Sequence, residues 1–554
     1  MLPIFTLFLP TALIHALYQT SIFGLADSLN IDELSPVLNA WIELVGAESR
    51  SQTNRCWGFE SDCDFSKSYS AEHVKCTRNS KRPGLDTPEL TNLFWKQGDF
   101  GSLRERQSTI ATICNSESET GSFLECSDHL RFCRGRNIFF DLKNLNAKTS
   151  SRYRSDVLRP GEVGGQCNSF FDPSLLKQRS DEPGYLQSWA GELKHFSTFE
   201  NFDINDPTAC DVVFDRPTVV IKLDAAVNMY HHFCDFVNLF ASQFLNNTYF
   251  GKDVDILWWD TFSGGFDDSW FGVTWKVFSI HKPHELVHYN GKKVCFRNVM
   301  LPLLARQLRG LYYNMPLVDG CHRSGLFHAF SHHVLHRLGI IQEMAPKIQD
   351  TNQSNGSIIE TPAIRVTLLD RKTPHRKIAN VDELINALRA LPNVVANIVN
   401  YDPSAGLTFL DQLKITHNSD IFIGMHGSGL THLLFLPDWA AIFEIYNCDD
   451  ENCYRDLARL RGVKYWTWKK EDKVFPVAEG RHPTLNTPHK KFTDYRFDVE
   501  EFLRIVKQMI EYVRRHPEYV KYRRQWRQMR QNASDNDSSN SSQLNEQLSK
   551  RKEL

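Results

Sequence analysis

The chain has 554 residues, with 64 Lys and Arg against 66 Asp and Glu, so its formal net charge is −2. A content of 41% hydrophobic and 23% charged residues is typical of a globular protein, and the length predicts about two to four domains. The near-neutral charge gives no bulk attraction for nucleic acid, and we expect no nucleic-acid partner.

Both ends of the chain resemble targeting signals. Residues 1–20 begin with an apolar run too short to span a bilayer comfortably, and small residues at Ala12 and Ala16 favour a signal peptide over an anchor. No later stretch is long and apolar enough to cross a membrane. The chain ends with a variant of an endoplasmic reticulum retrieval signal, Arg551, Lys552, Glu553 and Leu554. We therefore expect the protein in the lumen of the endoplasmic reticulum.

Cysteines and glycosylation sequons support this location. Thirteen cysteines are present, and residues 21–210 form a loop-rich, cysteine-containing N-terminal region in which Gly164–Cys167 has the pattern of a pinned loop. The sequence leaves the disulfide pairing open. Candidate N-glycosylation sites are Asn246, Asn352, Asn355, Asn532, Asn536 and Asn540. This combination is typical of an oxidising, glycosylating compartment.

Residues 211–355 predict a first Rossmann-like α/β unit. The expected elements are strands at 218–223, 254–259 and within 294–304, and helices at 228–245 and 327–340. Polar residues 351–361 then resemble a linker between domains. Alternation of strands and helices favours a parallel sheet.

Residues 360–480 predict a second Rossmann-like unit, which gives an α/β fold with a cleft between two such units. We expect strands at 364–369, 394–399, 421–423, 440–446 and 463–468, and helices at 380–391, 408–417, 431–436 and 453–460. Asn380 and Glu383 have capping-box spacing. Within 490–520, an amphipathic helix at 498–515 is expected to pack back across the first unit. Residues 521–554 predict a disordered tail.

The most informative stretch follows the expected strand 421–423. Glycines at 424, 427 and 429 let the backbone approach a ligand, and the N–H groups of a following helix can face a phosphate. Glu444, inside the next expected strand, could hold a ribose hydroxyl. The spacing is not the dinucleotide fingerprint, and glycines also mark ordinary tight turns. With His426 inside the loop, we interpret it as a nucleotide-phosphate site.

Two other groups could take part in chemistry. Arg371 and Arg376 follow the strand 364–369 at its carboxyl end and could neutralise a diphosphate, although the surrounding loop could equally be a solvated basic segment. His231 and Asp235 lie four residues apart at the start of a helix and share a face, so Asp235 could orient His231 or act as a base beside it. A capped helix end with a satisfied histidine is the alternative.

Two metal-like motifs are weaker. His284–His288 reads His-Glu-x-x-His, but the helix around it would be barely two turns long, and we interpret the match as coincidence. Asp253 and Asp255 form an Asp-x-Asp pair that precedes its strand, which is the wrong end for a nucleotide-sugar metal site.

Several segments together make the chain similar to glycosyltransferase family sixty-one, from about residue 55 to 513. The widest family feature is the Gly-Met-His-Gly-Ser-Gly-Leu-Thr-His stretch at 424–432. The other matching segments are Cys56–Phe59 with Cys63, Tyr230–Leu239, Gly325–Phe330, Leu410–Asn418 and Cys453–Gly462.

The resemblance implies a GT-B-like fold, with the first unit on the acceptor side and the second binding UDP-GlcNAc. It further implies an inverting transfer to Ser or Thr of a folded EGF-like repeat in secreted or membrane proteins. Asp235, with His231, is then the candidate base. The candidate donor-binding residues are Arg371, Arg376, Gly424, His426, Gly427, Ser428, Gly429, Leu430 and Glu444.

One departure keeps alternatives open. An Asp-Tyr-Asp motif of the family is replaced here by Ile280-His281-Lys282. The need for a divalent metal therefore stays open, with Mn²⁺ as the candidate ion but no clear ligand motif. The alternative functions are a catalytically inactive lumenal protein that binds EGF folds, or a family relative that acts on O-mannosylated proteins.

Overall fold

The computed structural model describes residues 70–76, 87–145, 158–181, 186–224, 228–246, 251–261, 271–307, 318, 320–350, 359–402, 406–477 and 479–530. The expected signal peptide, the segment around Cys56, the retrieval signal and every candidate glycosylation site except Asn246 lie outside these residues. Residues 56–519 belong to one compact unit, and 520–554 are grouped apart from it with 1–55. Within the described part, the structure contains no helix with the length and apolarity that crossing a bilayer requires.

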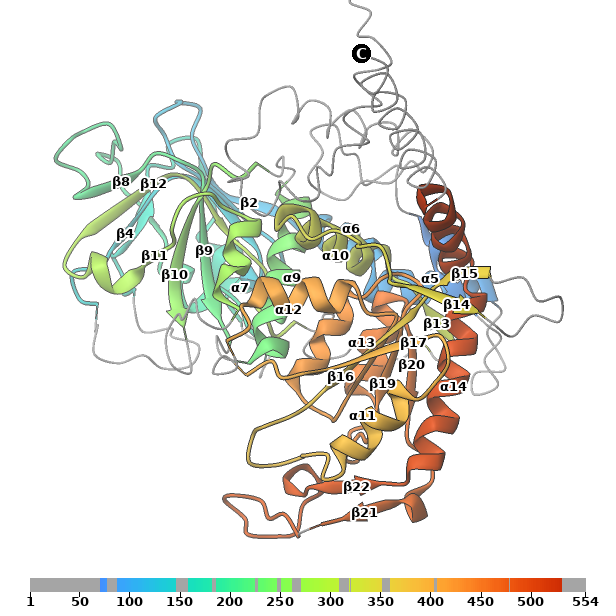
Figure 1. Ribbon diagram of the computed structural model, residues 1–554. Coiled ribbons are helices and arrows are strands. Elements are labelled where there is room, and N and C mark those ends of the chain that lie inside the picture. Colours follow the sequence, from blue (N-terminus) through green and yellow to red (C-terminus); the bar gives the residue numbers. More distant parts are fainter. Residues whose placement is uncertain are drawn as a thin grey trace, which may run out of the picture. The chain divides into compact units, whose positions relative to one another are not determined.

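The first sheet has eleven strands and combines parallel and antiparallel pairing (Figure 1). Its main path runs β11-β10-β9-β12-β4-β3-β2-β6, in which β11 to β12 are parallel and β4 turns antiparallel to β12. The strands on this path are β2 (Ala111–Asn115), β3 (Phe123–Cys126), β4 (Cys133–Asp141), β6 (Phe170–Phe171), β9 (Thr218–Leu223), β10 (Asp255–Thr261), β11 (His284–Glu285) and β12 (Lys293–Leu301). The off-path strands are β5 (Val163–Gly165), β7 (Ser197–Thr198) and β8 (Val212–Phe214).

This sheet corrects the expected boundary between the N-terminal region and the first Rossmann-like unit. β4 pairs directly with β12, and β3, β2 and β6 continue the same sheet outward from β4, so the two predicted regions share one sheet. The short helices of the N-terminal part are α5 (Thr87–Gly98), α6 (Phe100–Gln107), α7 (Pro173–Arg179) and α8 (Ala190–Leu193).

Helix α9 (Met229–Leu245) connects β9 to β10 and lies at the centre of the core. Asn228 caps it, because the Asn228 Oδ1 atom accepts the N–H of Tyr230 at 3.1 Å. Phe233 of α9 is fully buried against Phe435, with ring centroids 5.2 Å apart, and against Phe330 of α10 (Gly325–Arg337) at 6.2 Å. Aromatic packing through α9 therefore joins the first sheet to elements of the second.

The second sheet is wholly parallel, with the order β17-β16-β18-β19-β20. Its strands are β16 (Ile364–Leu369), β17 (Val394–Val399), β18 (Ile421–Gly424), β19 (Ala441–Glu444) and β20 (Lys464–Thr467), connected by α11 (Val381–Arg389), α12 (Phe409–His417), η7 (Ser428–Phe435) and α13 (Cys453–Arg461). The predicted strands and helices of this region are confirmed, except that 428–435 is a 3₁₀ segment. Asn380 forms no capping box, because its amide hydrogen-bonds the backbone of Phe497 instead.

The C-terminal elements differ from expectation. Helix α14 (Val499–Arg515) lies against the second sheet, where Phe502 stacks on Phe443 of β19 at 6.0 Å, rather than across the first. Residues 517–530 are helical, which corrects the predicted disorder over 521–530. Tyr519, Tyr522 and Trp526 recur at helical spacing there. The remaining strand pairs are β1 (Lys75–Cys76) with β13 (Cys321–His322), β14 (Lys347–Asp350) with β15 (Ile359–Pro362), and β21 (Val474–Pro476) with β22 (Tyr495–Phe497).

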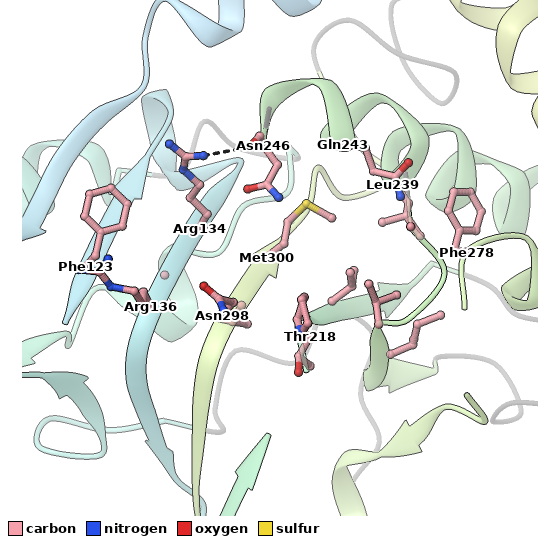
Figure 2. Close-up of a pocket in the computed structure, with 17 residues that line it drawn as sticks. Phe123, Arg134, Arg136, Thr218, Leu239, Gln243, Asn246, Phe278, Asn298 and Met300 are labelled. Atoms are coloured by element: carbon pink, nitrogen blue, oxygen red, sulfur yellow. Dashed lines mark hydrogen bonds between the residues drawn. The ribbon is translucent and has the colours of Figure 1, made fainter. Parts of the chain in front are cut away.

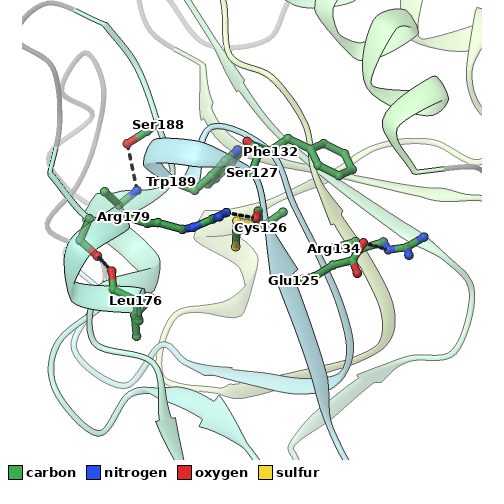
Figure 3. The surroundings of a disulfide bond; sticks show 12 residues. Glu125, Cys126, Ser127, Phe132, Arg134, Leu176, Arg179, Ser188 and Trp189 are labelled. Atoms are coloured by element: carbon green, nitrogen blue, oxygen red, sulfur yellow. Dashed lines mark hydrogen bonds and ion pairs between the residues drawn. A yellow bond between two sulfur atoms is a disulfide. The ribbon is translucent and has the colours of Figure 1, made fainter. Parts of the chain in front are cut away.

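Four disulfides hold the first sheet and its neighbours: Cys76–Cys321, Cys114–Cys167, Cys126–Cys133 and Cys210–Cys295. The second confirms that the Gly164–Cys167 loop is pinned. The third closes the hairpin between β3 and β4, where Arg179 Nη1 donates to the carbonyl of Cys126 and Glu125 pairs with Arg134 (Figure 3). Among the described cysteines, Cys234, Cys448 and Cys453 are free.

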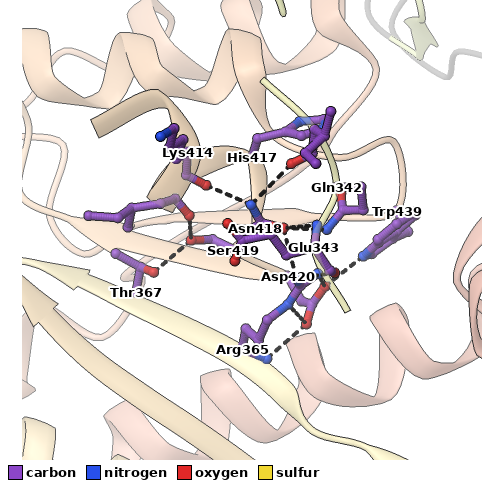
Figure 4. A network of polar contacts seen from close by, with 12 residues as sticks. Gln342, Glu343, Arg365, Thr367, Lys414, His417, Asn418, Ser419, Asp420 and Trp439 are labelled. Carbon is purple, nitrogen blue, oxygen red and sulfur yellow. Dashed lines mark hydrogen bonds and ion pairs between the residues drawn. The ribbon is translucent and has the colours of Figure 1, made fainter. Parts of the chain in front are cut away.

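A buried ion pair anchors the start of β18 (Figure 4). Asp420 is fully buried and accepts three hydrogen bonds from Arg365: from its backbone N–H at 2.8 Å, from Nε at 3.3 Å and from Nη2 at 3.0 Å. Trp439 Nε1 donates to the same carboxylate at 2.8 Å. These bonds tie β16, β18 and the segment before β19 together at the amino end of β18.

We expect Asp420→Asn to destabilise the protein by about 3–5 kcal/mol, because it leaves the Arg365 charge buried without its counter-ion. The urea midpoint of unfolding measures this. Glu511→Gln removes the exposed Arg515–Glu511 pair and should cost less than about 1 kcal/mol. Equal midpoint shifts for the two variants would contradict the assignment.

Candidate functional site

The loop after β18 passes close to an arginine from the neighbouring strand. Gly427 has φ 156° and ψ 165°, and a Cβ atom placed there would lie 2.3 Å from Nη1 of Arg371. In the sheet, β17 lies on one side of β16, and the next strand in sequence, β18, lies on its other side. The strand order therefore reverses between β16 and β18, where this loop lies. Open parallel sheets bind ligands at the carboxyl ends of their strands at such a point.

Arg371 and Arg376 meet over this loop, as predicted from their place after β16. Arg376 Nη1 donates to the carbonyl of His426 at 3.0 Å, and Arg371 Nε donates to the carbonyl of His375 at 3.0 Å. Arg376 Nε is buried and has no acceptor within the described structure. Burial and the neighbouring Arg376 charge lower the pKa of Arg371 to about 10. Two crowded cations with an unused donor are suited to a bound dianion.

Backbone N–H groups at the start of η7 lie beside the two guanidinium groups as further hydrogen-bond donors. Ser428 and Gly429 are the first residues of η7, and the first N–H groups of such a segment have no acceptor inside it. Leu430 closes the turn by donating its N–H to the carbonyl of Gly427 at 2.9 Å, and its buried side chain packs near Gly424. The predicted Gly424–Leu430 loop is therefore brought together with both arginines.

The predicted role of Glu444 needs correction. Glu444 is fully buried, and both of its carboxylate oxygens are occupied: Oε1 lies 2.7 Å from His426 Nδ1, and Oε2 accepts the hydroxyl of Tyr465 at 2.5 Å. This leaves Glu444 poorly placed to hold a ribose. It instead fixes the ring of His426, whose Nε2 lies 3.6 Å from Asp450 Oδ2.

A row of aromatic rings leads from this loop to α9. The ring of Tyr454, the second residue of α13, lies 5.4 Å from that of His426 and 6.0 Å from that of Tyr230, and Tyr230 lies 6.3 Å from its neighbour His231. Burial raises the pKa of Tyr454 well above its usual value. This row of rings connects His231 to the arginine loop, although His231 lies on α9, the helix that follows β9 of the first sheet.

His231 pairs with Asp224, and not with Asp235 as predicted. His231 Nδ1 lies 2.5 Å from Oδ2 of Asp224, which directly follows β9. The Asp224 carboxylate is buried and also pairs with Arg306 at 3.4 Å, whereas the His231 side chain is 25% exposed. A histidine oriented by a buried carboxylate and open to solvent on one side can act as a general base.

Asp235 faces the interior. Its Oδ2 atom accepts the backbone N–H of Asp224 at 2.8 Å, and burial raises its pKa well above the usual value for an aspartate. Because the carboxylate of Asp235 is buried and already accepts a backbone N–H, its surroundings favour a structural role over that of a base.

The two weaker motifs lie away from this region. His284 belongs to β11 and His288 to η5 (Leu286–Tyr289), so they do not share a helix face. Asp255 pairs with Arg216 at 2.9 Å and Asp253 with His281 at 2.7 Å, at the amino end of β10.

Three residues of the region escaped the sequence interpretation: Asp224, Tyr454 and Tyr465. Asp224 had a usable signal, because it follows a strand at its carboxyl end. Tyr465 had none, because its contact with Glu444 depends on how β20 lies beside β19.

Comparisons with known proteins agree on one family. The model of Glycosyltransferase 61 matches residues 229–443. A Mus musculus protein named EGF domain-specific O-linked N-acetylglucosamine transferase is 47% identical over 466 residues, which cover 84% of each chain. Proteins of the same name from Xenopus laevis and Drosophila melanogaster are 46% and 43% identical, covering 84% of this chain and 84% and 86% of theirs.

We expect Gly427→Ala to weaken the binding of inorganic pyrophosphate about tenfold or more, because its new methyl group displaces the Arg371 guanidinium from charged hydrogen bonds. Calorimetric titration measures the affinity. Gly161→Ala is the matched control, since Gly161 also has positive φ, at 86°, but has open space around it. Unchanged affinity in Gly427→Ala would remove this loop from the site.

Proposed function

This chain belongs to glycosyltransferase family 61 and is a glycosyltransferase, and we propose that it moves N-acetylglucosamine from UDP-GlcNAc to Ser or Thr hydroxyls of folded EGF-like domains. The observation that carries the proposal is the pair of arginines over Gly427, inside the family's matched region, whose charges suit a diphosphate. The named acceptor of three relatives supports the choice of EGF-like domains.

The proposed arrangement is GT-B-like. The parallel strands β11-β10-β9-β12 and the second sheet would be its two Rossmann-like units, with α9 of the first reaching the donor loop of the second. The disulfides support a proposed location in an oxidising compartment, which we take to be the lumen of the endoplasmic reticulum.

In the proposed inverting reaction, the acceptor oxygen attacks C1 of the sugar while the bond from C1 to the UDP oxygen breaks. Arg371, Arg376 and the N–H groups of Ser428 and Gly429 would hold the negative charge that develops on UDP. His231, oriented by Asp224, would take the proton of the acceptor hydroxyl. UDP leaves with the electron pair of the broken bond.

The nearby carboxylates fit a divalent metal poorly. Asp370 pairs with Lys372 at 2.5 Å, Asp450 pairs with Lys491 at 2.8 Å, and Glu444 is held by His426 and Tyr465. We therefore propose that the two arginines perform the charge neutralisation that Mg²⁺ or Mn²⁺ performs in metal-dependent enzymes.

Radiolabelled UDP-GlcNAc and a folded, disulfide-intact EGF-like repeat test the function directly. We expect transfer to the folded repeat, and the same rate after addition of a chelator. A reduced, unfolded repeat is the matched control acceptor and should accept little label. Calorimetry with UDP separates the remaining outcomes: UDP binding without transfer would favour an inactive EGF-binding protein, and loss of activity with chelator would contradict the arginine assignment.

The base assignment is tested with three variants. His231→Ala should lower kcat by about 10²-fold or more, because a positioned base contributes about that much. Asp224→Asn should lower kcat in the same direction and change the pH–rate profile, since it leaves the imidazole without its carboxylate. Asp235→Asn should stay within about tenfold of the wild type, because the buried Asp235 side chain accepts the Asp224 N–H and an asparagine oxygen can do the same. A larger loss in Asp235→Asn than in His231→Ala would return the role to Asp235.

A further inference from the structure

A second cavity lies at the opposite end of β9 from the proposed transfer site. It has a volume of about 340 Å³ and opens where β9 and β10 begin, beside the end of α9 (Figure 2). Thr218 lines this cavity, whereas Asp224 follows the other end of the same strand. At about 3.3 Å per residue, the two ends are roughly 17 Å apart. The cavity is therefore separate from the arginine loop.

One wall of the cavity carries two arginines with different surroundings. Arg134 pairs with Glu125 and donates from Nη1 to the carbonyl of Asn246 at the end of α9, at 2.9 Å. Its charge is thus compensated by a carboxylate and a helix C-terminus. Arg136 faces Phe123 on β3 and Asn298 on β12, neither of which is acidic. Its Nε atom is buried and has no acceptor in the described part of the chain.

Apolar side chains make up much of the remaining lining, and Gln243 adds an acceptor atom that has no donor among the described residues. Leu239, Ile256 and Phe278 are buried and line the cavity. Gln243 of α9 also lines it, and its Oε1 atom is buried without a donor from any described residue. Figure 2 shows Arg136 on β4 beside Phe123, and Gln243 on α9, on different sides of the cavity. A buried N–H donor and a buried acceptor without partners each cost free energy unless a ligand meets them.

We propose that this cavity binds a small organic acid: a monocarboxylate with an apolar body and a hydroxyl group at its far end. The carboxylate pairs with Arg136, which supplies one uncompensated positive charge. The apolar body packs against Leu239 and Phe278, and the hydroxyl donates to Gln243 Oε1. The cavity volume lies at the low end of the usual range for ligand sites, which suits a single-ring compound.

The test uses the full chain and calorimetry, with 3-(4-hydroxyphenyl)propionate as the probe. We expect saturable binding at one site per chain. Arg136→Gln should weaken it about tenfold or more, because a charged hydrogen-bonded pair is lost. Lys292→Gln, which removes an exposed positive charge outside the cavity lining, should leave binding unchanged. The melting temperature of each variant verifies folding.

Two related compounds make the test independent of any variant. The amide of the probe lacks the charge and should bind about tenfold more weakly or worse. 3-Phenylpropionate lacks the hydroxyl, so it should bind the wild type more weakly than the probe does. The Gln243→Leu variant should bind both compounds with the same affinity. Absence of saturable binding, or equal affinity for acid and amide, would overturn the proposal. Since the measurement requires no transfer, its result is independent of the proposed function.

Discussion

The second sheet is organised around the close approach of Arg371 to the backbone of Gly427. A side chain at position 427 would occupy the place of the guanidinium, so glycine is required if both arginines are to meet over the loop. Their mutual repulsion is tolerated because the surroundings fix them: Arg376 is held by the carbonyl of His426, and His426 is held in turn by Glu444. At the other end of β18 from the loop, the buried Arg365–Asp420 pair fixes where β18 begins. The protein's own contacts therefore hold the two arginines in place without a ligand.

The strands of the second sheet and the positions of its arginines and glycines were predictable from local sequence patterns. Residues 421–424 are a continuous apolar run, and 364–369 are rich in aliphatic residues, so both are typical of buried parallel strands. The arginines and glycines follow the carboxyl ends of these strands. Topology then brings these ends together without any knowledge of side-chain contacts. That is why the arginine–glycine arrangement was predicted correctly as a group.

The predictions that failed depended on contacts between residues distant in sequence. Glu444 and Asp235 have the right residue type and spacing, but whether a carboxylate faces a ligand or the interior depends on neighbours distant in sequence, such as Tyr465 and the N–H of Asp224. The antiparallel pairing of β4 with β12 joins segments more than 150 residues apart and leaves no periodic trace in either. The direction in which α14 packs was likewise set by Phe443, a partner that the helix sequence does not specify.

The pairing of Cys76 with Cys321 spans 245 residues, and this has a consequence for biosynthesis. A ribosome adds about 5–20 residues per second, so Cys76 waits tens of seconds for its partner to be made. During that time Cys114, Cys126 and Cys133 have already emerged nearby. The native disulfide of Cys76 therefore forms only after β13 is synthesised, and any earlier disulfide of Cys76 must be undone by thiol–disulfide exchange. A truncation before residue 321 would leave Cys76 without its native partner.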